Sequence, residues 1–432
     1  MPNPDSVSIP RWIDEEAGAV ITSREYVRHF SEVVTRKLRR ELQAERVEEP
    51  KYTHSLDEVE MTALYFLQSA QASSVRDERI ALFHEAAILF EQLSSLRSQE
   101  DLKQENAPEL AGQRYLVAAC CYFLAGYEAN ATVMANVLNK GKTRFALSIT
   151  ASLVALLLSK NLKELRSVLA NASLGMPEED ASLAGLLEET YLFGDIVYEA
   201  SVKALLRAIS SWVHWVRTGE PKLRKDAQID LLLAIKGFDG CGRILDSMIL
   251  RLLIDIMGLW YERSPWNLLS PVLTGLSSTN WTLYIRLLAA GQSPITEFWK
   301  SQLQIVSDVL NLTNGLVISL PTSAGKTRLA EVAIANELTN QPARKAVYVV
   351  PTRALASEIE QTLSLRLGPM NFGVAALYGG YDLSDFEETL LEENRILVLT
   401  PEKLDMLMRR QQGFSEHICL VVVDEGHQVA GG

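Results

Sequence analysis

Seven residues at positions 321–327, Pro-Thr-Ser-Ala-Gly-Lys-Thr, have the composition of a phosphate-binding loop. The apolar run 315–320 precedes them and a helical pattern follows, which is the order strand, tight loop, helix. Backbone N–H groups of such a loop can surround a triphosphate, the Lys326 ammonium can reach its outer phosphates, and the Thr327 hydroxyl can bind Mg²⁺. The alternative is a chance Gly-Lys-Thr, because the pattern expects glycine where this chain has Leu320.

Two neighbouring carboxylates, Asp424 and Glu425, directly follow the apolar run 418–423. A carboxylate at the carboxyl end of a strand beside a phosphate loop can hold Mg²⁺, usually through water. Asp424 suits that role, and Glu425 can orient and deprotonate an attacking water. The alternative is a pair on a surface turn, against which the three preceding valines argue.

The elements that would position these residues alternate between short apolar runs and helical segments. The apolar runs are 315–320, 345–350, 372–378, 395–399 and 418–423. Runs of this kind joined by crossover helices predict a parallel sheet with helices on both faces. The fold class expected for residues 292–432 is therefore α/β, with a parallel sheet and a phosphate loop.

Apolar residues recur at helical spacing through almost all of residues 53–291, which predicts a large all-α domain ahead of the α/β domain. Predicted helices at 79–96, 110–126 and 131–140 have the lengths of antiparallel pairs. They are similar to tetratricopeptide-like solenoids, and an irregular helical bundle is the alternative. Residues 1–52 are expected to be a lead-in with a charged helix at 23–45, whose basic face is either solvated or a phosphate contact.

Aromatic side chains in the helical region permit two interpretations. Trp212-Val213-His214-Trp215 and residues 256–261 could stack on bases, or their large rings could fill the core at the ends of apolar helices. Core packing is the expectation, with His214 as a core histidine.

Composition restricts the class of protein. The chain has 432 residues, 47% hydrophobic and 22% charged, with a net charge of −12, as in a soluble globular protein. The charge argues against broad basic contact with nucleic acid but permits a few phosphate contacts in a groove. Four scattered cysteines indicate a reducing cytoplasm and no zinc site. The apolar stretch 145–159 is too short to span a membrane and is expected to be a buried helix.

Six short segments occur in the order that they have in one family of motor proteins. They are Phe-Trp-Lys-Ser-Gln at 298–302, the loop at 321–327, Pro-Thr-Arg-Ala-Leu-Ala at 351–356, Tyr-Gly-Gly at 378–380, Thr-Pro-Glu-Lys-Leu at 400–404 and Asp-Glu-Gly-His at 424–427. With them, residues 296–432 resemble the superfamily 2 helicases of the DExH type. The residues within these segments are most similar to those of the Ski2-like branch and of bacterial relatives found in antiviral defence operons.

The resemblance implies a RecA-like domain that binds ATP and Mg²⁺. Its implied nucleotide-binding residues are Gln302, which would read adenine, and the loop residues Thr322, Ser323, Ala324, Gly325, Lys326 and Thr327. The implied catalytic residues are Lys326, Asp424, Glu425 and His427, with Thr327 and Asp424 as metal ligands. In the family, the histidine couples the nucleotide site to a second motor domain.

The same resemblance implies contacts with a single nucleic-acid strand. The residues concerned are Pro351, Thr352, Arg353, Gly380, Thr400 and Pro401. Thr352 and Thr400 lie at strand-to-helix junctions, where helix N-termini and hydroxyl groups can hold backbone phosphates without reading sequence. Arg353 either adds a charge contact or forms a salt bridge to Glu358 or Glu360.

The chain resembles the N-terminal part of such a helicase, ending just after the second motif. The family also has a further motif and a second RecA-like domain whose arginine finger contributes ~10³ to 10⁵ in rate, so these 432 residues alone are expected to be nearly inactive. The expected function is an ATP-dependent helicase or translocase on DNA or RNA, in bacterial defence or genome maintenance. The alternative is an ATP-gated scaffold whose helical domain docks a protein partner such as a nuclease.

Overall fold

The computed structural model describes residues 20–21, 23–41, 53–95, 107–140, 147–174, 193–274, 278–290, 294–321, 325–378, 384–411 and 413–426. The chain divides into two compact units. Unit 1 comprises Met1–Trp215 and Glu220–Gly258, and unit 2 comprises Val216–Gly219 and Leu259–Gly432. No helix in the described ranges has both the length and the apolar character needed to cross a membrane.

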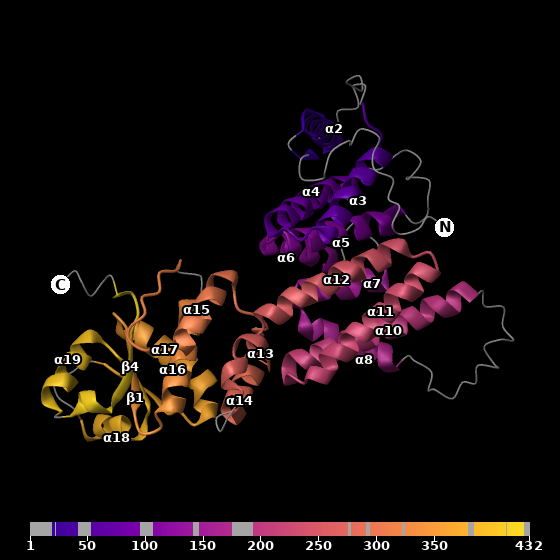
Figure 1. The fold of residues 1–432 in the computed structure, drawn as a ribbon. Helices are drawn as coiled ribbons and strands as arrows, with labels where there is room; N and C mark the ends of the chain where they lie inside the picture. Colours follow the sequence, from indigo (N-terminus) through magenta and orange to yellow (C-terminus); the bar gives the residue numbers. More distant parts are fainter. Residues whose placement is uncertain are drawn as a thin grey trace. The chain divides into compact units, whose positions relative to one another are not determined.

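Unit 1 is helical throughout its described residues (Figure 1). Its helices are α2 (Arg24–Glu41), α3 (Leu56–Ala72), α4 (Arg76–Ser95), α5 (Ala107–Leu124), α6 (Glu128–Asn139), α7 (Ile149–Leu158), α8 (Leu162–Leu174), α10 (Phe193–Thr218), α11 (Pro221–Gly240) and α12 (Ile244–Arg263). From α3 to α8 each helix packs on the next along the chain. The predicted helices at 79–96, 110–126 and 131–140 are confirmed as α4, α5 and α6, and the buried apolar helix as α7.

A buried acidic residue joins three parts of unit 1. Asp246 of α12 is 1% exposed and accepts hydrogen bonds from Gln113 Nε2 of α5 at 3.2 Å and from Ser148 Oγ, ahead of α7, at 2.8 Å. Its second oxygen accepts from Arg243 Nε at 2.8 Å. Because every partner is a donor, the buried charge is compensated and fixes the arrangement of these helices.

The aromatic residues of α10 lie where core packing predicts. Trp212 and Trp215 are buried, with ring centroids 4.5 Å apart, and Trp260 of α12 is buried as well. Core packing is therefore confirmed for these three rings. The expectation for His214 is wrong, because that side chain is exposed. Positions 212 and 215 share one helix face, and a rotation of about 100° per residue turns position 214 to the opposite side.

Unit 2 contains a four-stranded parallel sheet with strand order β2-β3-β1-β4 (Figure 1). Its strands are β1 (Lys345–Val349), β2 (Val374–Leu377), β3 (Ile396–Leu399) and β4 (Ile418–Val423). Its helices are α13 (Pro265–Leu268), η2 (Ser270–Val272), α14 (Ser278–Ala290), α15 (Lys300–Leu310), α16 (Lys326–Asn340), α17 (Arg353–Leu367), η3 (Gly368–Met370), α18 (Asp385–Glu393), α19 (Pro401–Arg410) and η4 (Phe414–His417). The predicted α/β class, with a helical region ahead of it, is confirmed.

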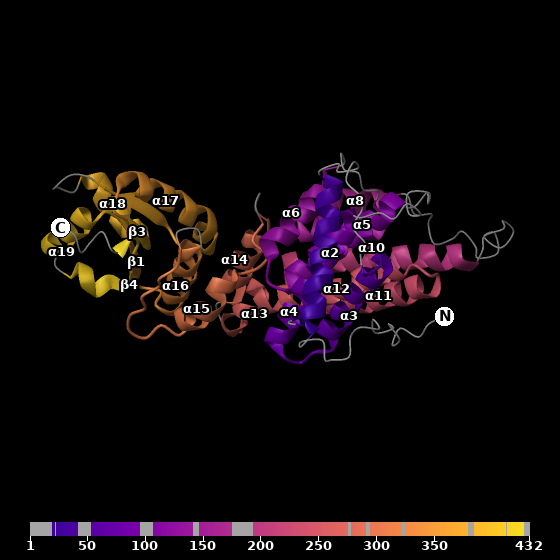
Figure 2. The same ribbon diagram turned by 90° about the horizontal axis from the view of Figure 1, so that it is seen from above.

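Helices cover both faces of the sheet, as the continuous apolar strands predict. On β1, Ala346 and Tyr348 belong to the core that includes α14, α15, α16 and α17. Val347 and Val349 belong to the second core, with α18 and α19. Figure 2 shows α16 to the right of β1 and α19 to its left, on opposite sides of the sheet.

Packing divides the chain earlier than the predicted domain boundary at 291/292. The division along the chain falls between Gly258 and Leu259, within α12. Trp281 and Tyr284 of α14 lie in the same core as Tyr348, so this helix packs with the sheet. The boundary at 291/292 stays a prediction about the family domain.

The structure corrects the prediction of a strand at 315–320. These residues are outside any strand, and Val317 is 96% exposed. An apolar run becomes a strand only where a neighbouring backbone pairs with it, and among the described residues none pairs with this one. β4 is consequently the edge of the described sheet, not a buried strand, and Val421 and Val423 are 46% and 50% exposed.

Candidate functional site

The sheet topology brings three predicted motifs to one edge. β1 pairs with β3 on one side and with β4 on the other, all in parallel. Val350 N–H donates to the Leu399 carbonyl at 2.9 Å, and Asp424 N–H donates to the Val349 carbonyl at 2.9 Å. The carboxyl ends of these strands therefore lie in a row, and the segments that follow them are neighbours although they are far apart in sequence.

The phosphate loop ends at Gly325, the residue before α16. Gly325 has φ +72°, a left-handed conformation that favours glycine, and its carbonyl accepts a hydrogen bond from Gln302 Nε2 at 2.9 Å. A Cβ atom on Gly325 would lie 2.4 Å from that nitrogen. Gln302 also accepts from Trp299 N–H at 2.8 Å, so its amide joins α15 to the loop. Thr322, Ser323 and Ala324 lie outside the described residues.

Lys326 and Glu425 approach one another across this edge. Lys326 Nζ lies 3.9 Å from Glu425 Oε1, and both side chains are about a quarter to a third exposed. Glu425 has φ +49°, a conformation that costs a non-glycine residue ~1 to 2 kcal/mol. A strained residue at the end of a strand is a frequent property of functional positions.

Asp424 has a hydrogen-bond donor on each carboxylate oxygen. Tyr348 Oη donates to Oδ2 at 3.2 Å, and Glu425 N–H donates to Oδ1 at 2.9 Å. Burial, and then the charge of Asp424, raise the pKa of Tyr348 well above its usual range.

Sequence reasoning missed Tyr348. The available signal was a residue with a polar tip in the middle of an apolar run, since a buried tyrosine hydroxyl usually has a hydrogen-bond partner. Only the pairing of β1 with β4 identifies that partner as Asp424.

The residues present fit a magnesium nucleotide. Thr327 and Asp424 offer a hydroxyl and a carboxylate, the hard oxygen ligands that Mg²⁺ prefers. Lys326 and the N-terminus of α16 offer positive charge and N–H groups to phosphates. A cavity of about 200 Å³, lined among others by Ile318, Lys326, Tyr348 and Asp424, adjoins these groups.

The predicted nucleic-acid residues lie on the helices that follow β1 and β3. Thr352 precedes α17, and its Oγ1 accepts from Leu355 N–H at 3.3 Å. Thr400 and Pro401 begin α19, where Thr400 is only 6% exposed. Pro351 is partly exposed in the loop between β1 and α17. Gly380 and His427 lie outside the described residues.

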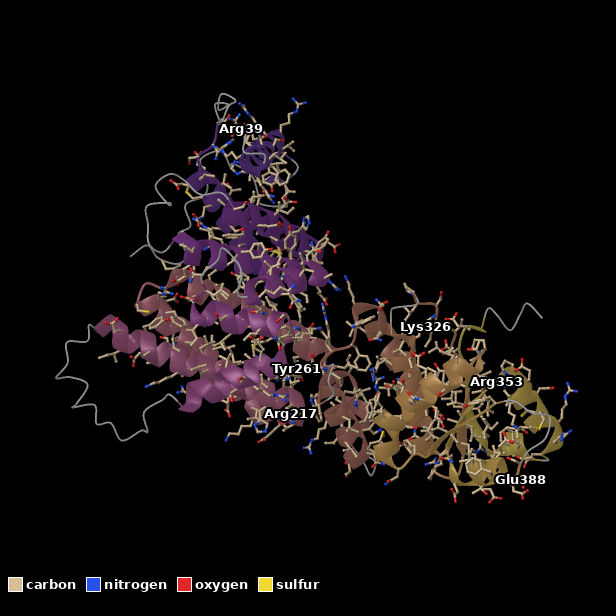
Figure 3. The ribbon with its side chains drawn as sticks, turned by 180° about the vertical axis from the view of Figure 1, so that it is seen from behind. Arg39, Arg217, Tyr261, Lys326, Arg353 and Glu388 are labelled. Atoms are coloured by element: carbon tan, nitrogen blue, oxygen red, sulfur yellow. The ribbon has the colours of Figure 1, made fainter. Side chains whose placement is uncertain are left out.

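Arg353, the first residue of α17, is exposed (Figure 3). Within the described ranges it forms no salt bridge with Glu358 or Glu360, so that alternative is wrong. Glu360 Oε1 instead accepts from Ala376 N–H of β2 at 3.0 Å. The Arg353 guanidinium therefore faces solvent near the edge that carries the other predicted contacts.

Comparison with known proteins agrees with this geometry. Residues 299–432 match the DEAD/DEAH box helicase family. The Hachiman protein HamB of Bacillus cereus is 28% identical over 384 residues, which cover 88% of this chain and 32% of that protein. The ATP-dependent DNA helicase Hel308 of Pyrococcus abyssi is 34% identical over 137 residues, 31% of this chain and 18% of Hel308. The DExH-box ATP-dependent RNA helicase DExH14 of Arabidopsis thaliana is 33% identical over 136 residues, 29% of this chain and 6% of that protein.

The chain spans about a third or less of the length of these relatives. The match to HamB extends beyond residues 299–432 into the helical region, whereas the Hel308 match has the length of the helicase segment alone. The family match, the parallel sheet and the ordered motifs agree with one another. Residues 299–432 of this chain therefore match a DEAD/DEAH box helicase domain and are similar to helicases of the DExH type.

Proposed function

We propose that this protein acts as an ATP-dependent helicase or translocase that moves along a strand of DNA or RNA. The observation that carries the proposal is the approach of Lys326 to Glu425 at 3.9 Å, beside Asp424 and Thr327. These four side chains come from the first turn of α16 and the end of β4, about a hundred residues apart. Their proximity supports the proposal that they bind ATP and take part in its hydrolysis.

Each of these residues has a distinct part in the proposed reaction. Lys326 binds the β- and γ-phosphates by its charge, and Thr327 and Asp424 hold Mg²⁺. The metal, when bound, neutralises charge on the phosphate oxygens. Glu425 orients the attacking water and takes its proton as the bond from water oxygen to the γ-phosphorus forms and the bond to the leaving oxygen breaks.

The proposed nucleic-acid contacts lie along the same sheet edge. The N-termini of α17 and α19, with Thr352 and Arg353, offer N–H groups, a hydroxyl and one charge to backbone phosphates. Contacts of this kind carry no sequence information, which suits a motor that tracks a strand. They also require few basic residues, in keeping with the net charge of −12.

A role in bacterial antiviral defence, in the cytoplasm, is part of the proposal. It is supported by the resemblance of the motifs to helicases of defence operons and by the match to the Hachiman protein HamB over 88% of this chain. The helical unit would be an accessory or partner-docking region. The ATP-gated scaffold stays an alternative that no contact within the described residues specifically favours.

The test is nucleic-acid-stimulated ATP hydrolysis by the full-length protein. Lys326→Ala and Glu425→Gln are each expected to lower kcat by at least ~10² to 10³, the effect of removing a group that stabilises the transition state or positions the water. Lys225→Ala on α11 and Glu416→Gln in η4, both exposed, are matched controls that should retain full activity. Undiminished hydrolysis in both site variants would refute the proposal.

A further inference from the structure

We propose that Lys403 and Glu387 are positioning residues for the nucleic-acid site, because together they fix the first turn of α19, where Thr400 and Pro401 lie. Lys403 Nζ donates to Glu387 Oε1 of α18 at 2.8 Å. The inference rests on the proposed function and adds two residues that are not among the predicted contacts. Neither side chain touches the strand in this role, and both act through α19.

Lys403 is a lysine at a core position. The buried face of α19 consists of Lys403, Met406 and Leu407, the spacing of one side of a helix. Met406 and Leu407 pack in the core that also contains Leu391 of α18. Lys403 is only 2% exposed. Its ammonium group therefore cannot bind a phosphate at the surface without leaving the core.

The carboxylate of Glu387 compensates this buried ammonium. A buried charge is costly unless it is paired and hydrogen-bonded. Among the residues that the structure describes, Glu387 is the one carboxylate that forms an ion pair with Lys403. Without that partner, the ammonium would have to be hydrated, which would draw the first turn of α19 away from α18. The pair thus determines where α19 begins relative to its neighbour.

Glu387 is itself held in place by the start of α18. Its Oε2 accepts a hydrogen bond from Ser384 N–H at 3.1 Å, and Glu387 N–H donates to Ser384 Oγ at 3.3 Å. This reciprocal pair is a capping box, which fixes the first turn of the helix. The other oxygen, Oε1, binds Lys403. One carboxylate therefore joins the first turns of two helices.

The turn that Lys403 anchors carries the proposed phosphate contacts. Thr400 directly precedes α19, three residues before Lys403, and its carbonyl accepts from Leu404 N–H at 3.0 Å. The Thr400 side chain forms no capping hydrogen bond, so the placement of its hydroxyl depends on the backbone of this turn. The N–H groups of the same turn are the proposed donors to backbone phosphates. A displaced turn would move all of these donors together.

The salt dependence of nucleic-acid binding distinguishes this role from a direct phosphate contact. Labelled oligothymidylate and oligouridylate are titrated with the full-length protein at several salt concentrations. Loss of a lysine that binds a phosphate lowers the slope of log K against log salt by about 0.7. Lys403→Met should instead weaken binding about tenfold, the effect of losing one hydrogen bond to a charged group, at an unchanged slope.

Glu387→Gln separates the two roles by the sign of the effect. Glutamine keeps an oxygen for Ser384 N–H, so the capping box is retained while the charge is removed. If Lys403 acts through Glu387, this variant weakens binding as Lys403→Met does. If Lys403 bound a phosphate, removal of the neighbouring negative charge would strengthen binding. Affinity for an ATP analogue should be unchanged in both variants, which checks that the domain remains folded.

Arg409→Met is the matched control on the same helix. Arg409 pairs with Asp405 at 2.9 Å, but its side chain is 77% exposed and lies in the last turn of α19, so both affinity and slope should be retained. Unchanged binding in Lys403→Met or Glu387→Gln, stronger binding in Glu387→Gln, or a lower slope in Lys403→Met would overturn the inference and leave the proposed function in place. If the unaltered protein binds neither strand, the proposed function itself fails.

Discussion

Gly325 occupies a backbone position at which the loop, the helix and Gln302 all meet. Its φ of +72° places it in the left-handed region, and the Gln302 amide packs where a side chain would begin. Gln302 accepts from Trp299 N–H and donates to the Gly325 carbonyl, so part of the hydrogen-bonding capacity of its amide is used within the loop. The amide that is predicted to read adenine is thus also a contact that shapes the loop.

Gly325→Ala should abolish nucleotide binding and lower stability. The left-handed conformation costs alanine ~1 kcal/mol, and the new Cβ at 2.4 Å would push the Gln302 amide away from the loop. Gly413→Ala is the matched control: its φ is +84°, but the nearest atom to a Cβ, Glu416 Oε2, lies at 3.9 Å. Calorimetric titration with an ATP analogue should show binding lost only in Gly325→Ala. Equal binding in the two variants would contradict the role of the Gln302 contact.

At the scale of elements, α2 is held to α3 and α4 by a small polar and aromatic cluster. Tyr26 donates to Glu85 of α4 and packs edge-on against Phe66 of α3, with ring centroids 5.2 Å apart. His29 is fully buried, with its ring centroid 4.6 Å from that of His54. Burial, and then the charge of His54, lower the pKa of His29 to about 4 from its ordinary 6.5.

This cluster predicts that unit 1 loses stability in mild acid. Between pH 6.5 and pH 4 the unfolded chain binds a proton at position 29 that the folded chain does not, so stability falls as the pH decreases through this window. The loss is at most ~3 kcal/mol, from about 1.4 kcal/mol for each pH unit. His29→Leu should flatten the dependence in urea unfolding at pH 7 and pH 5, and the exposed His214→Leu should not. A slope unchanged by His29→Leu would rule out this cause.

The elements that sequence predicts best are those whose pattern and burial agree. The runs at 345–350 and 395–399 became β1 and β3 because four consecutive apolar residues in each need cover on both faces. The run at 315–320 is also largely apolar, but no described backbone pairs with it, and such pairing cannot be deduced from a local sequence pattern. The hydrogen bond from Tyr348 to Asp424 joins residues that are 76 positions apart. It depends on the order of the strands, which a local sequence pattern likewise does not determine.

At the scale of the whole molecule, two units have separate cores and different sources of stability. Unit 1 depends on helix packing and on the buried Asp246, whereas unit 2 is built around two cores on the faces of a sheet. The predicted nucleotide residues that the structure describes all belong to unit 2. A ligand that binds one unit stabilises that unit by RT ln(1 + [L]/Kd), about 2.7 kcal/mol at a hundredfold excess over Kd.

Differential scanning calorimetry should therefore resolve two unfolding transitions. A magnesium ATP analogue should raise the midpoint temperature of only one of them, the transition of unit 2. Asp246→Ala should lower the free energy of unfolding of unit 1 by ~3 to 5 kcal/mol, because Gln113, Ser148 and Arg243 lose a buried charged acceptor. Asp405→Ala, which breaks an exposed ion pair to Arg409, is the control. It should change the free energy of unfolding of either unit by less than ~1 kcal/mol. If the analogue and Asp246→Ala shift the same transition, the units unfold as one body, and the helical region is then energetically coupled to the nucleotide site.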